Sequence, residues 1–220
     1  MRKAIAFVLG IFMVFGLSAC GGSKGNNNSG DSGSGGDSTP TGPYTITEAE
    51  FATLKAKMAS PKIFIEGNFT VDLTLSGSTF KNKFANGKVD CYVQGEHFVL
   101  DIDVSTYDAT KQTANGDMYE YDEDDEAWSK DASIIDVGAF ASYSLGFETV
   151  FALSPSSLDS FTYNEETRLY TGNRTMGDDT YVTKFMVKDG QFLSYEVVGM
   201  FGYEFSDYGT TTVTLPELAA

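Results

Sequence analysis

Polar and apolar side chains alternate along residues 62–75 of this 220-residue chain. The apolar positions share one parity and the polar positions share the other; they are Ile63, Ile65, Phe69, Val71, Leu73 and Leu75 against Glu66, Asn68, Thr70, Asp72 and Thr74. Because successive side chains of a β-strand point to opposite faces, this period of two predicts a strand with one buried and one solvated face.

Four more stretches repeat this alternation toward the C-terminus, with apolar positions at Phe98, Leu100, Ile102 and Val104; Tyr181, Phe185 and Val187; Leu193, Tyr195 and Val197; and Phe201, Tyr203 and Phe205. Asn86-Gly87 and Asp189-Gly190 stand between predicted strands, and these residue types tolerate the positive φ angles of two-residue hairpin turns. Since the strand-helix-strand order of a parallel sheet is missing, we expect an antiparallel sheet of about nine or ten strands in meander order.

Residues 47–60 have the pattern of an amphipathic helix that packs through one apolar face. Thr47 and Glu50 match a capping box, and Ile46 and Phe51 are spaced for a hydrophobic staple around it. One face of this helix would carry Phe51, Leu54 and Met58. That spacing is expected of a helix docked on a sheet.

Residues 131–153 break the two-residue period and are strongly apolar. After the first residue, their only charged side chains are Asp136 and Glu148. The segment is too apolar for a surface loop and too irregular for a strand. It predicts one or two helices, broken near Gly146 and ended by Pro155, that pack against the apolar face of the sheet.

The N-terminus has the composition of an export signal. Arg2 and Lys3 precede an uncharged, mostly apolar run that ends at Leu17, and this run is shorter than the roughly 20 residues that a membrane-spanning helix needs. The tetrad Leu17-Ser18-Ala19-Cys20 resembles the lipobox of bacterial lipoproteins, which implies a diacylglycerol on the Cys20 sulfur and cleavage just before Cys20. The alternative is an ordinary secretory signal cleaved near Ala19, which would leave a spare thiol.

Residues 1–19 are thus predicted to be a lipoprotein signal peptide, and residues 20–43 a lipidated cysteine with a disordered linker rich in Gly, Ser and Asn. Residues 44–220 remain for a single β-rich domain. The expected location is lipid-anchored and extracytoplasmic, on the outer face of the plasma membrane, or in the periplasm or outer membrane of a diderm host. Two long acyl chains would hold the protein on the membrane permanently.

Two short motifs accompany this organisation. They are Phe205-Ser206-Asp207-Tyr208-Gly209 followed by Val213-Thr214-Leu215-Pro216, and Met118-Tyr119-Glu120-Tyr121 with Trp128. With the lipidated cysteine, the tether and the order of elements, residues 44–218 resemble the LolA and LppX type of lipoprotein. The resemblance implies an α+β, mainly β fold, in which a curved antiparallel meander sheet forms an open half-barrel and helices close its concave face over an apolar cavity. It also implies carriage of a lipid, in an anchored role closer to LppX than to the soluble LolA carriers.

The charge balance and the rare residue types exclude several kinds of site. With 15 basic and 31 acidic residues, the chain is too acidic to favour nucleic acid. His97 is the only histidine, which argues against a catalytic triad and against zinc sites built on several His or Cys.

Cys91 shares a strand face with Val89 and Val93 and is expected to be a buried hydrophobe. The acidic run 122–126 lacks EF-hand spacing and is expected to be a solvated turn, with calcium binding left open.

We therefore expect a membrane-anchored lipoprotein that binds a lipid or another hydrophobic small molecule, with no catalytic residues, metal or cofactor, and with its oligomeric state left open. The residues predicted to line the cavity are Ile134, Ile135, Phe140, Leu145, Phe147 and Phe151. The alternative is a non-enzymatic surface protein that interacts with another protein or has a structural role, without a ligand cavity. A hydrolase is the third possibility, although no convergent polar residues indicate one.

Overall fold

The computed structural model describes residues 44–93, 95–176 and 178–218. The predicted signal peptide and linker, including Leu17, Ser18, Ala19 and Cys20, lie outside the described residues. The described chain forms one antiparallel sheet of 11 strands with four α-helices. The mainly β, α+β class expected from the alternation is confirmed, with more strands than predicted. No helix of the described residues is long and apolar enough to cross a membrane.

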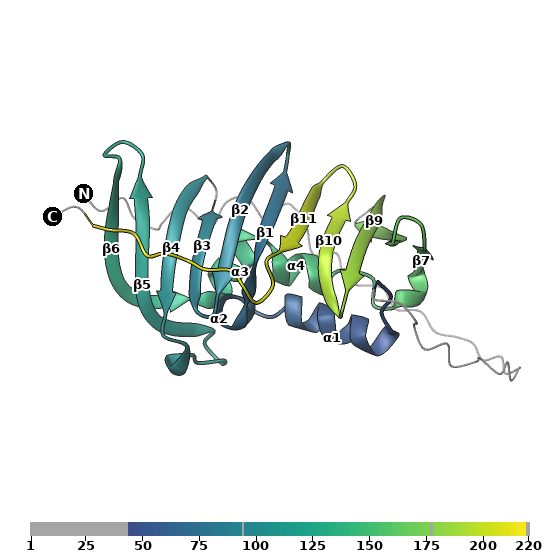
Figure 1. Cartoon of the computed structure of the whole chain (residues 1–220), viewed down its shortest axis with the longest axis horizontal. Coiled ribbons are helices and arrows are strands. Elements are labelled where there is room, and N and C mark those ends of the chain that lie inside the picture. The colour runs from purple at the N-terminus through teal and green to yellow at the C-terminus, as the bar shows by residue number, and fades with distance from the viewer. Residues whose placement is uncertain (1–43, 94, 177, 219–220) are drawn as a thin grey trace, which may run out of the picture.

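The strands lie in the order β6-β5-β4-β3-β2-β1-β11-β10-β9-β8-β7 (Figure 1). Two meanders therefore run outward from the central pair β1 and β11, and β6 and β7 are the edge strands of the sheet that the described residues form. The strands are β1 (Asn68–Leu75), β2 (Ser78–Ala85), β3 (Lys88–Val93), β4 (Glu96–Ile102), β5 (Thr113–Asp122), β6 (Ala127–Asp136), β7 (Phe161–Asn164), β8 (Leu169–Met176), β9 (Asp179–Lys188), β10 (Gln191–Val197) and β11 (Phe201–Ser206).

The helices are α1 (Glu48–Met58), α2 (Ile63–Glu66), α3 (Val137–Ser144) and α4 (Phe147–Ala152), and two short 3₁₀ turns are η1 (Val104–Thr106) and η2 (Leu158–Ser160). The predicted capping box begins α1: Thr47 Oγ1 accepts a hydrogen bond from the Glu50 amide at 3.3 Å, and Glu50 Oε2 accepts one from the Thr47 amide at 2.9 Å. Phe51, the expected staple partner of Ile46, is fully buried, as is Ile46 itself.

Both predicted hairpin turns are confirmed. Asn86 and Gly87 join β2 to β3 with φ angles of 52° and 93°, and Asp189 and Gly190 join β9 to β10 with 51° and 70°. Gly87 is also required by space, since a Cβ there would lie 2.8 Å from the Ile102 carbonyl oxygen.

The predicted strand over residues 62–75 is wrong in its first part. Ile63 and Ile65 lie in α2, and the strand begins only at Asn68. Phe64 between them is buried as deeply as they are, so three consecutive side chains need burial. A strand would turn the middle one to the opposite face, whereas a single helical turn brings all three toward the core.

The predicted helical segment 131–153 is also wrong in its first part. Residues up to Asp136 continue β6, which pairs with β5 along its whole length. The helix begins only after Asp136, whose carboxylate accepts a hydrogen bond from the Ala139 amide at 2.8 Å. The break at Gly146 is confirmed, since this glycine has a φ of 62° between α3 and α4.

Two single positions depart from the predicted alternation. The ladder of β10 and β9 shifts register between Phe192 and Ser194. This bulge carries Phe192 into the core, whereas Leu193 had been predicted there. At the end of β4 the chain turns into η1, so Val104 is exposed rather than buried.

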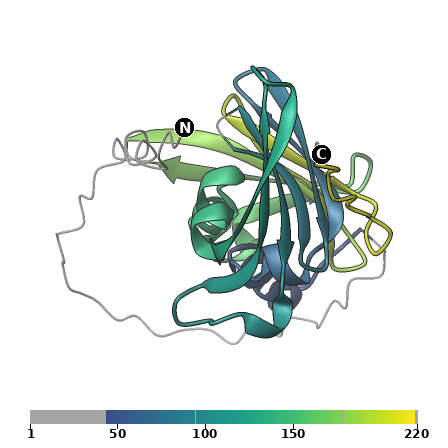
Figure 2. The same ribbon diagram turned by 90° about the vertical axis from the view of Figure 1, so that its left-hand side faces the viewer.

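All four helices contact one face of the sheet, called here the inner face. Phe51 of α1 stacks on Phe185 at 5.2 Å, and Phe64 of α2 meets Phe84 at the same ring separation. Phe140 of α3 meets Phe98 at 6.0 Å, while Phe147 of α4 meets Phe84 and Phe205 at 6.2 and 6.1 Å. Figure 2 shows the sheet curving around α3 and α4.

The opposite face, called the outer face, is crossed by the chain after β11 (Figures 1 and 2). The Gly209 amide donates to the Asn68 carbonyl at 2.9 Å, and the Thr211 hydroxyl lies 3.1 Å from that of Thr70. Thr70 is a polar strand residue that is nevertheless buried. The C-terminal segment is therefore part of the fold.

Candidate functional site

The six residues predicted to line a ligand cavity separate into two groups. Ile134 is 70% exposed on β6 and lies away from the helices. Ile135, Leu145, Phe147 and Phe151 are buried in the core, and Phe140 packs against them. The structure thus brings five of the six to the inner face, and Ile134 is corrected to a surface position because it precedes Ile135 on a strand, where neighbours point to opposite faces.

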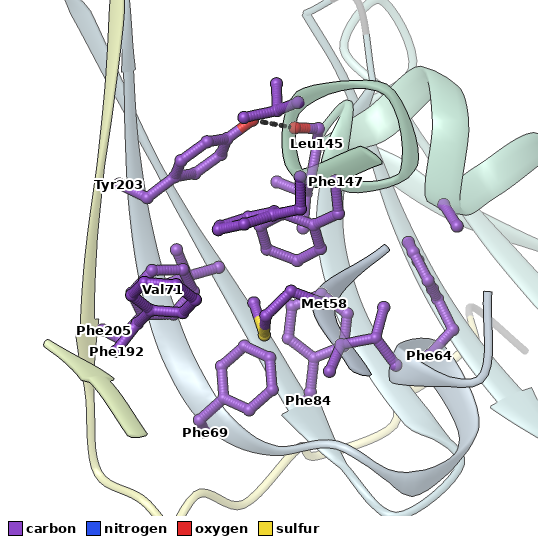
Figure 3. Close-up of a cluster of buried hydrophobic side chains, with 14 of the residues drawn as sticks. Met58, Phe64, Phe69, Val71, Phe84, Leu145, Phe147, Phe192, Tyr203 and Phe205 are labelled. Carbon is purple, nitrogen blue, oxygen red and sulfur yellow. Dashed lines mark hydrogen bonds between the residues drawn. The ribbon is translucent and has the colours of Figure 1, made fainter. Parts of the chain in front are cut away.

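Aromatic rings occupy the space between α4 and the sheet. Phe151 lies 4.7 Å from Tyr195 and 5.1 Å from Phe192, and Phe147 lies 5.2 Å from Tyr203. Figure 3 shows Phe147 pointing from the helix toward the side chains of the sheet, with Phe69, Phe84 and Phe205 around it. The space in which an apolar cavity was expected is therefore filled by side chains in this structure.

Two hollows of the described surface lie on the outer face instead. One has a volume of about 590 Å³ and its lining includes Thr74, Lys184, Ser194, Glu196 and Glu204. The other, of about 430 Å³, has Asp72, Met186, Leu193 and Ser206 in its lining. Both are open and partly polar, unlike the enclosed apolar cavity that the sequence predicted.

Buried hydroxyl groups on the inner face of β10 and β11 form hydrogen bonds with the chain at the two ends of α4. They belong to Tyr195 and Tyr203. The Tyr203 hydroxyl donates to the carbonyl of Leu145, at the junction of α3 and α4 (Figure 3). Ser154 donates its hydrogen to the Val150 carbonyl at 2.8 Å, so in the hydrogen bond that Ser154 shares with Tyr195 the tyrosine is the donor. Burial raises the pKa of both tyrosines, which keeps them neutral donors.

Arg174 on β8 is the most unusual of the interior groups. Only 4% of its surface is exposed, and its Nε and Nη1 atoms are buried without a hydrogen-bond partner among the described residues. Burial raises the pKa of Tyr195 and Tyr203, and the charge of Arg174 opposes this rise in both; at Tyr195 a side-chain hydrogen bond with Arg174 opposes it as well. Burial lowers the pKa of Lys55 on α1, and Arg174 adds to this effect.

A second polar group without a partner lies on the neighbouring strand. Thr183 of β9 is fully buried, and its hydroxyl has no hydrogen bond among the described residues. It pairs with Gly172 of β8, two residues before Arg174, and with Val197 of β10. Arg174, Thr183, Tyr195, Tyr203 and Ser154 are called here the interior polar cluster.

This cluster was not predicted from the sequence, although a signal was present. On β8, Tyr170 points to the core, and alternation then places Gly172 and Arg174 on the same inner face. The polar and small residues of Leu169–Met176 hid this strand from a search for apolar alternation. Only the pairing with β9 shows that an arginine points inward.

The outer face of the other half carries the single histidine. The His97 ring nitrogen Nε2 lies 2.6 Å from Asp90 Oδ1, and its ring stacks on Tyr92 at 4.4 Å and meets Trp128 edge-on at 4.8 Å. Asp90 also pairs with Lys83 at 3.4 Å. The histidine thus contacts two aromatic rings and is hydrogen-bonded to Asp90 on the outer surface of the sheet.

Cys91 and the acidic run have the surroundings that were expected. Cys91 is a free, fully buried thiol whose pKa is raised by burial and, to a lesser degree, by Asp90. The residues 122–126 are exposed in the β5–β6 turn, where Asp122 Oδ1 accepts hydrogen bonds from the amides of Asp124 and Asp125 at 2.9 and 3.2 Å.

Within the part of the chain that the structure describes, no group of three or more His, Cys, Asp or Glu side chains could hold a metal ion.

No family model matches the chain, and no curated protein matches it. The candidate site is therefore defined by its own geometry: an aromatic inner face, two short apolar helices over it, and a polar cluster inside.

Proposed function

We propose that this protein is a membrane-anchored extracytoplasmic lipoprotein that binds or carries a lipid or another hydrophobic ligand on the inner face of its half-barrel sheet, beneath helices α3 and α4. It does so without catalysing a reaction. The observation that carries the proposal is the cover of the inner face: an extended aromatic surface is closed by two short helices rather than by a second sheet.

Displacement of these helices would uncover the aromatic surface. The helix α3 has 8 residues and α4 has 6, and a glycine with a φ of 62° separates them. Helices this short gain little from their own hydrogen bonds and depend on side-chain packing. Local opening of such a unit costs less than unfolding of the sheet. Because rings fill the space in the packed form, the ligand would replace α4 side chains rather than enter an empty cavity.

Large apolar side chains remain exposed around the two helices. Leu153 directly after α4 is 61% exposed, Tyr143 on α3 is exposed, and Ile134 precedes α3 on the β6 edge. Apolar groups at both ends of a mobile cover would give a hydrophobic ligand its first contacts with the protein.

The membrane anchor in this proposal depends on Cys20 and on the lipobox formed with Leu17, Ser18 and Ala19. Replacing Cys20 by alanine removes the thiol that would carry the lipid. The variant should move from the membrane fraction to the soluble fraction after cell lysis, and mass spectrometry should show no acyl mass. Retention of the Cys20→Ala protein on membranes would rule out this anchor.

A second candidate is a surface lipoprotein that interacts with another protein and has no ligand cavity. The filled interior favours it, since the inner face needs no ligand to bury its rings. The free edge β6 is ten residues long and presents the exposed Ile134. An exposed edge strand of this kind can pair with a strand of another chain.

Native mass spectrometry separates the two candidates. The described residues contain the whole sheet and its core, so residues 44–220 serve as the folded unit once a cooperative thermal transition is recorded. After purification from a bacterial host, adducts of lipid mass that disappear on denaturation would support the carrier and identify the ligand class. A clean apo mass that stays unchanged after incubation with total membrane lipid extract would reject the carrier in favour of the interaction protein.

A further inference from the structure

The interior polar cluster contains a buried positive charge, Arg174, that forms no ion pair with a carboxylate of the described residues. We propose that Arg174 binds the anionic head group of an amphipathic ligand, a carboxylate or a phosphate ester, whose hydrocarbon part lies against the aromatic inner face. The proposal rests on the proposed carrier function and names the chemical class of its ligand.

The free-energy cost of burying a charge indicates that Arg174 does not stabilise the ligand-free protein. An ionised group taken out of water costs free energy that incomplete hydrogen bonding does not offset, and Nε and Nη1 of Arg174 have no hydrogen-bond partner among the described residues. The ion pairs of the described residues involve other cations and leave Arg174 unpaired. A well-packed apolar side chain of similar length would avoid this cost. An arginine at such a site therefore needs a role other than packing.

The free atoms of the cluster match an anion. Nε and Nη1 of Arg174 lie on different edges of the guanidinium group, and each can donate a charge-assisted hydrogen bond to an oxygen of a carboxylate or phosphate. The unpaired Thr183 hydroxyl lies on the adjacent strand and the same inner face, so it can add a third donor.

The other charged groups nearby are already engaged. Lys55 Nζ donates to the carbonyls of Ser154 and Pro155 at 2.7 and 2.8 Å. Glu48, the acid whose charge acts on Lys55, accepts a hydrogen bond from the Leu158 amide at 2.6 Å. Lys55, Glu48 and Arg174 together carry a net positive charge, and Arg174 is the buried member of the three.

The surroundings of the cluster are apolar, which selects an amphipathic ligand over a free anion. Tyr195 lies against Phe151 and Phe192, at 4.7 and 5.9 Å between ring centroids. A ligand that displaces α4 from these rings would place its chain along them while its head group reaches Arg174. Inorganic phosphate would gain the charged contacts but none of the apolar ones.

The test uses twelve-carbon probes with different head groups. Binding of dodecyl phosphate, dodecanoate, dodecanol and inorganic phosphate to residues 44–220 is measured by isothermal titration calorimetry. The wild type should bind the two charged amphiphiles about tenfold or more tightly than dodecanol, because charge-assisted hydrogen bonds to a buried arginine distinguish the head groups. Arg174→Met should abolish this difference. The matched control Lys184→Met removes one positive charge from the outer face of β9 and should preserve it.

The outcomes separate this proposal from the carrier function. Equal binding of all three amphiphiles by the wild type would overturn the anion site while leaving the carrier intact. Binding of none of them would overturn both. If inorganic phosphate binds as tightly as dodecyl phosphate and only through Arg174, the anion site stands and the lipid carrier falls.

Thermal unfolding of the same variants without ligand gives an independent measurement. Arg174→Met should have a melting temperature equal to or above that of the wild type, because the unpaired charge is gone. A melting temperature lowered by more than about 5 °C, together with unchanged head-group preference, would show that the arginine is structural and would overturn the proposal.

Discussion

The two halves of the sheet bury different kinds of side chain on the same inner face. In strands β1–β6 most buried inner positions are aliphatic or small, and include Val71, Val89, Cys91, Leu100, Ile102, Ala114 and Ile135; the exceptions are Phe69, Phe84, Phe98 and Asn82. In strands β7–β11 they are largely aromatic, and include Tyr170, Phe185, Phe192, Tyr195, Tyr203 and Phe205. The first half therefore has a core without hydroxyl groups from its strands, whereas the second brings tyrosines and Arg174 inside.

This difference assigns different roles to the halves. Aliphatic side chains fill space without polar atoms, so the first half can act as a scaffold. Tyrosine rings bury a large area but need a partner for each hydroxyl group. For Tyr195 and Tyr203 these partners belong to the chain at the two ends of α4, whereas the Tyr170 hydroxyl accepts a hydrogen bond from the Ile46 amide before α1. In the second half, packing and the attachment of helices therefore depend on the same residues.

Phe185→Ala should produce the largest loss of stability. This ring is fully buried and lies 4.7 Å from Tyr170, 4.8 Å from Phe161 and 5.2 Å from Phe51. Removing it leaves a cavity among rigid rings that cannot close over it, so we expect about 4–5 kcal/mol less free energy of unfolding. Urea denaturation monitored by circular dichroism measures this value. A loss below about 1 kcal/mol would mean that the aromatic half is loosely packed.

Leu100→Ala tests the aliphatic half in the same way. Leu100 is fully buried on β4, and we expect a loss of about 3 kcal/mol, because smaller neighbours relax into the space more easily than rings do. The buried thiol of Cys91 reports on this half: it is the only cysteine of residues 44–220, and its labelling by a thiol reagent should become faster in the variant. Ligand binding should remain unchanged, and a changed affinity would contradict the division into scaffold and site.

The extent to which these halves could be predicted from the sequence follows from the same difference. Phe201, Tyr203 and Phe205 alternate cleanly, and β11 was predicted correctly. Arg174 was missed because the positions that follow Tyr170 on the inner face of β8 are Gly172 and Arg174, which interrupt the apolar alternation. Which side chains of such a strand face inward is decided by its pairing with β9 and by packing across the sheet. The local sequence pattern does not contain this information.

The predicted site shows a related limit. Leu145, Phe147 and Phe151 were predicted to line a ligand cavity; the structure shows that they are buried, as expected of a strongly apolar segment. A cavity and a filled core require the same apolar residues, so composition could not distinguish between them. Ile134 failed for a different reason: the helix was predicted to begin before Asp136, and strand geometry turned this side chain outward.

Tyr203→Phe removes one attachment of the helical cover with little change in shape. The buried carbonyl of Leu145 would lose its donor, and we expect a loss of about 1–2 kcal/mol. Hydrogen exchange at the amides of α4 should accelerate more than exchange in β1–β6. Tyr121→Phe on the outer face is the matched control and should stay within about 0.5 kcal/mol of the wild type. Uniform acceleration across both halves would show that the cover does not open separately.

Glu120→Gln is expected to change the stability least. It tests like-charge repulsion on β5, near the edge of the first half of the sheet. Burial raises the pKa of Glu120, and the carboxylates of Glu96 and Asp122 raise it further. A raised pKa in the folded state means that the protonated acid is favoured by folding. The stability from this group is therefore present below its ordinary pKa of 4.5 and is lost as the pH rises through the higher folded value.

The glutamine variant should consequently match the wild type at pH 4 and exceed it at pH 7. The side chain is exposed, so solvent and salt screen the repulsion, and the gain should be below about 0.5 kcal/mol and shrink further at high salt. Melting curves at both pH values, with Glu166→Gln in the β7–β8 turn as the control, measure the difference. A gain at pH 4 that equals the gain at pH 7 would assign the effect to packing of the amide. A gain confined to pH 7 would show that repulsion between like charges limits the stability of this end of the scaffold.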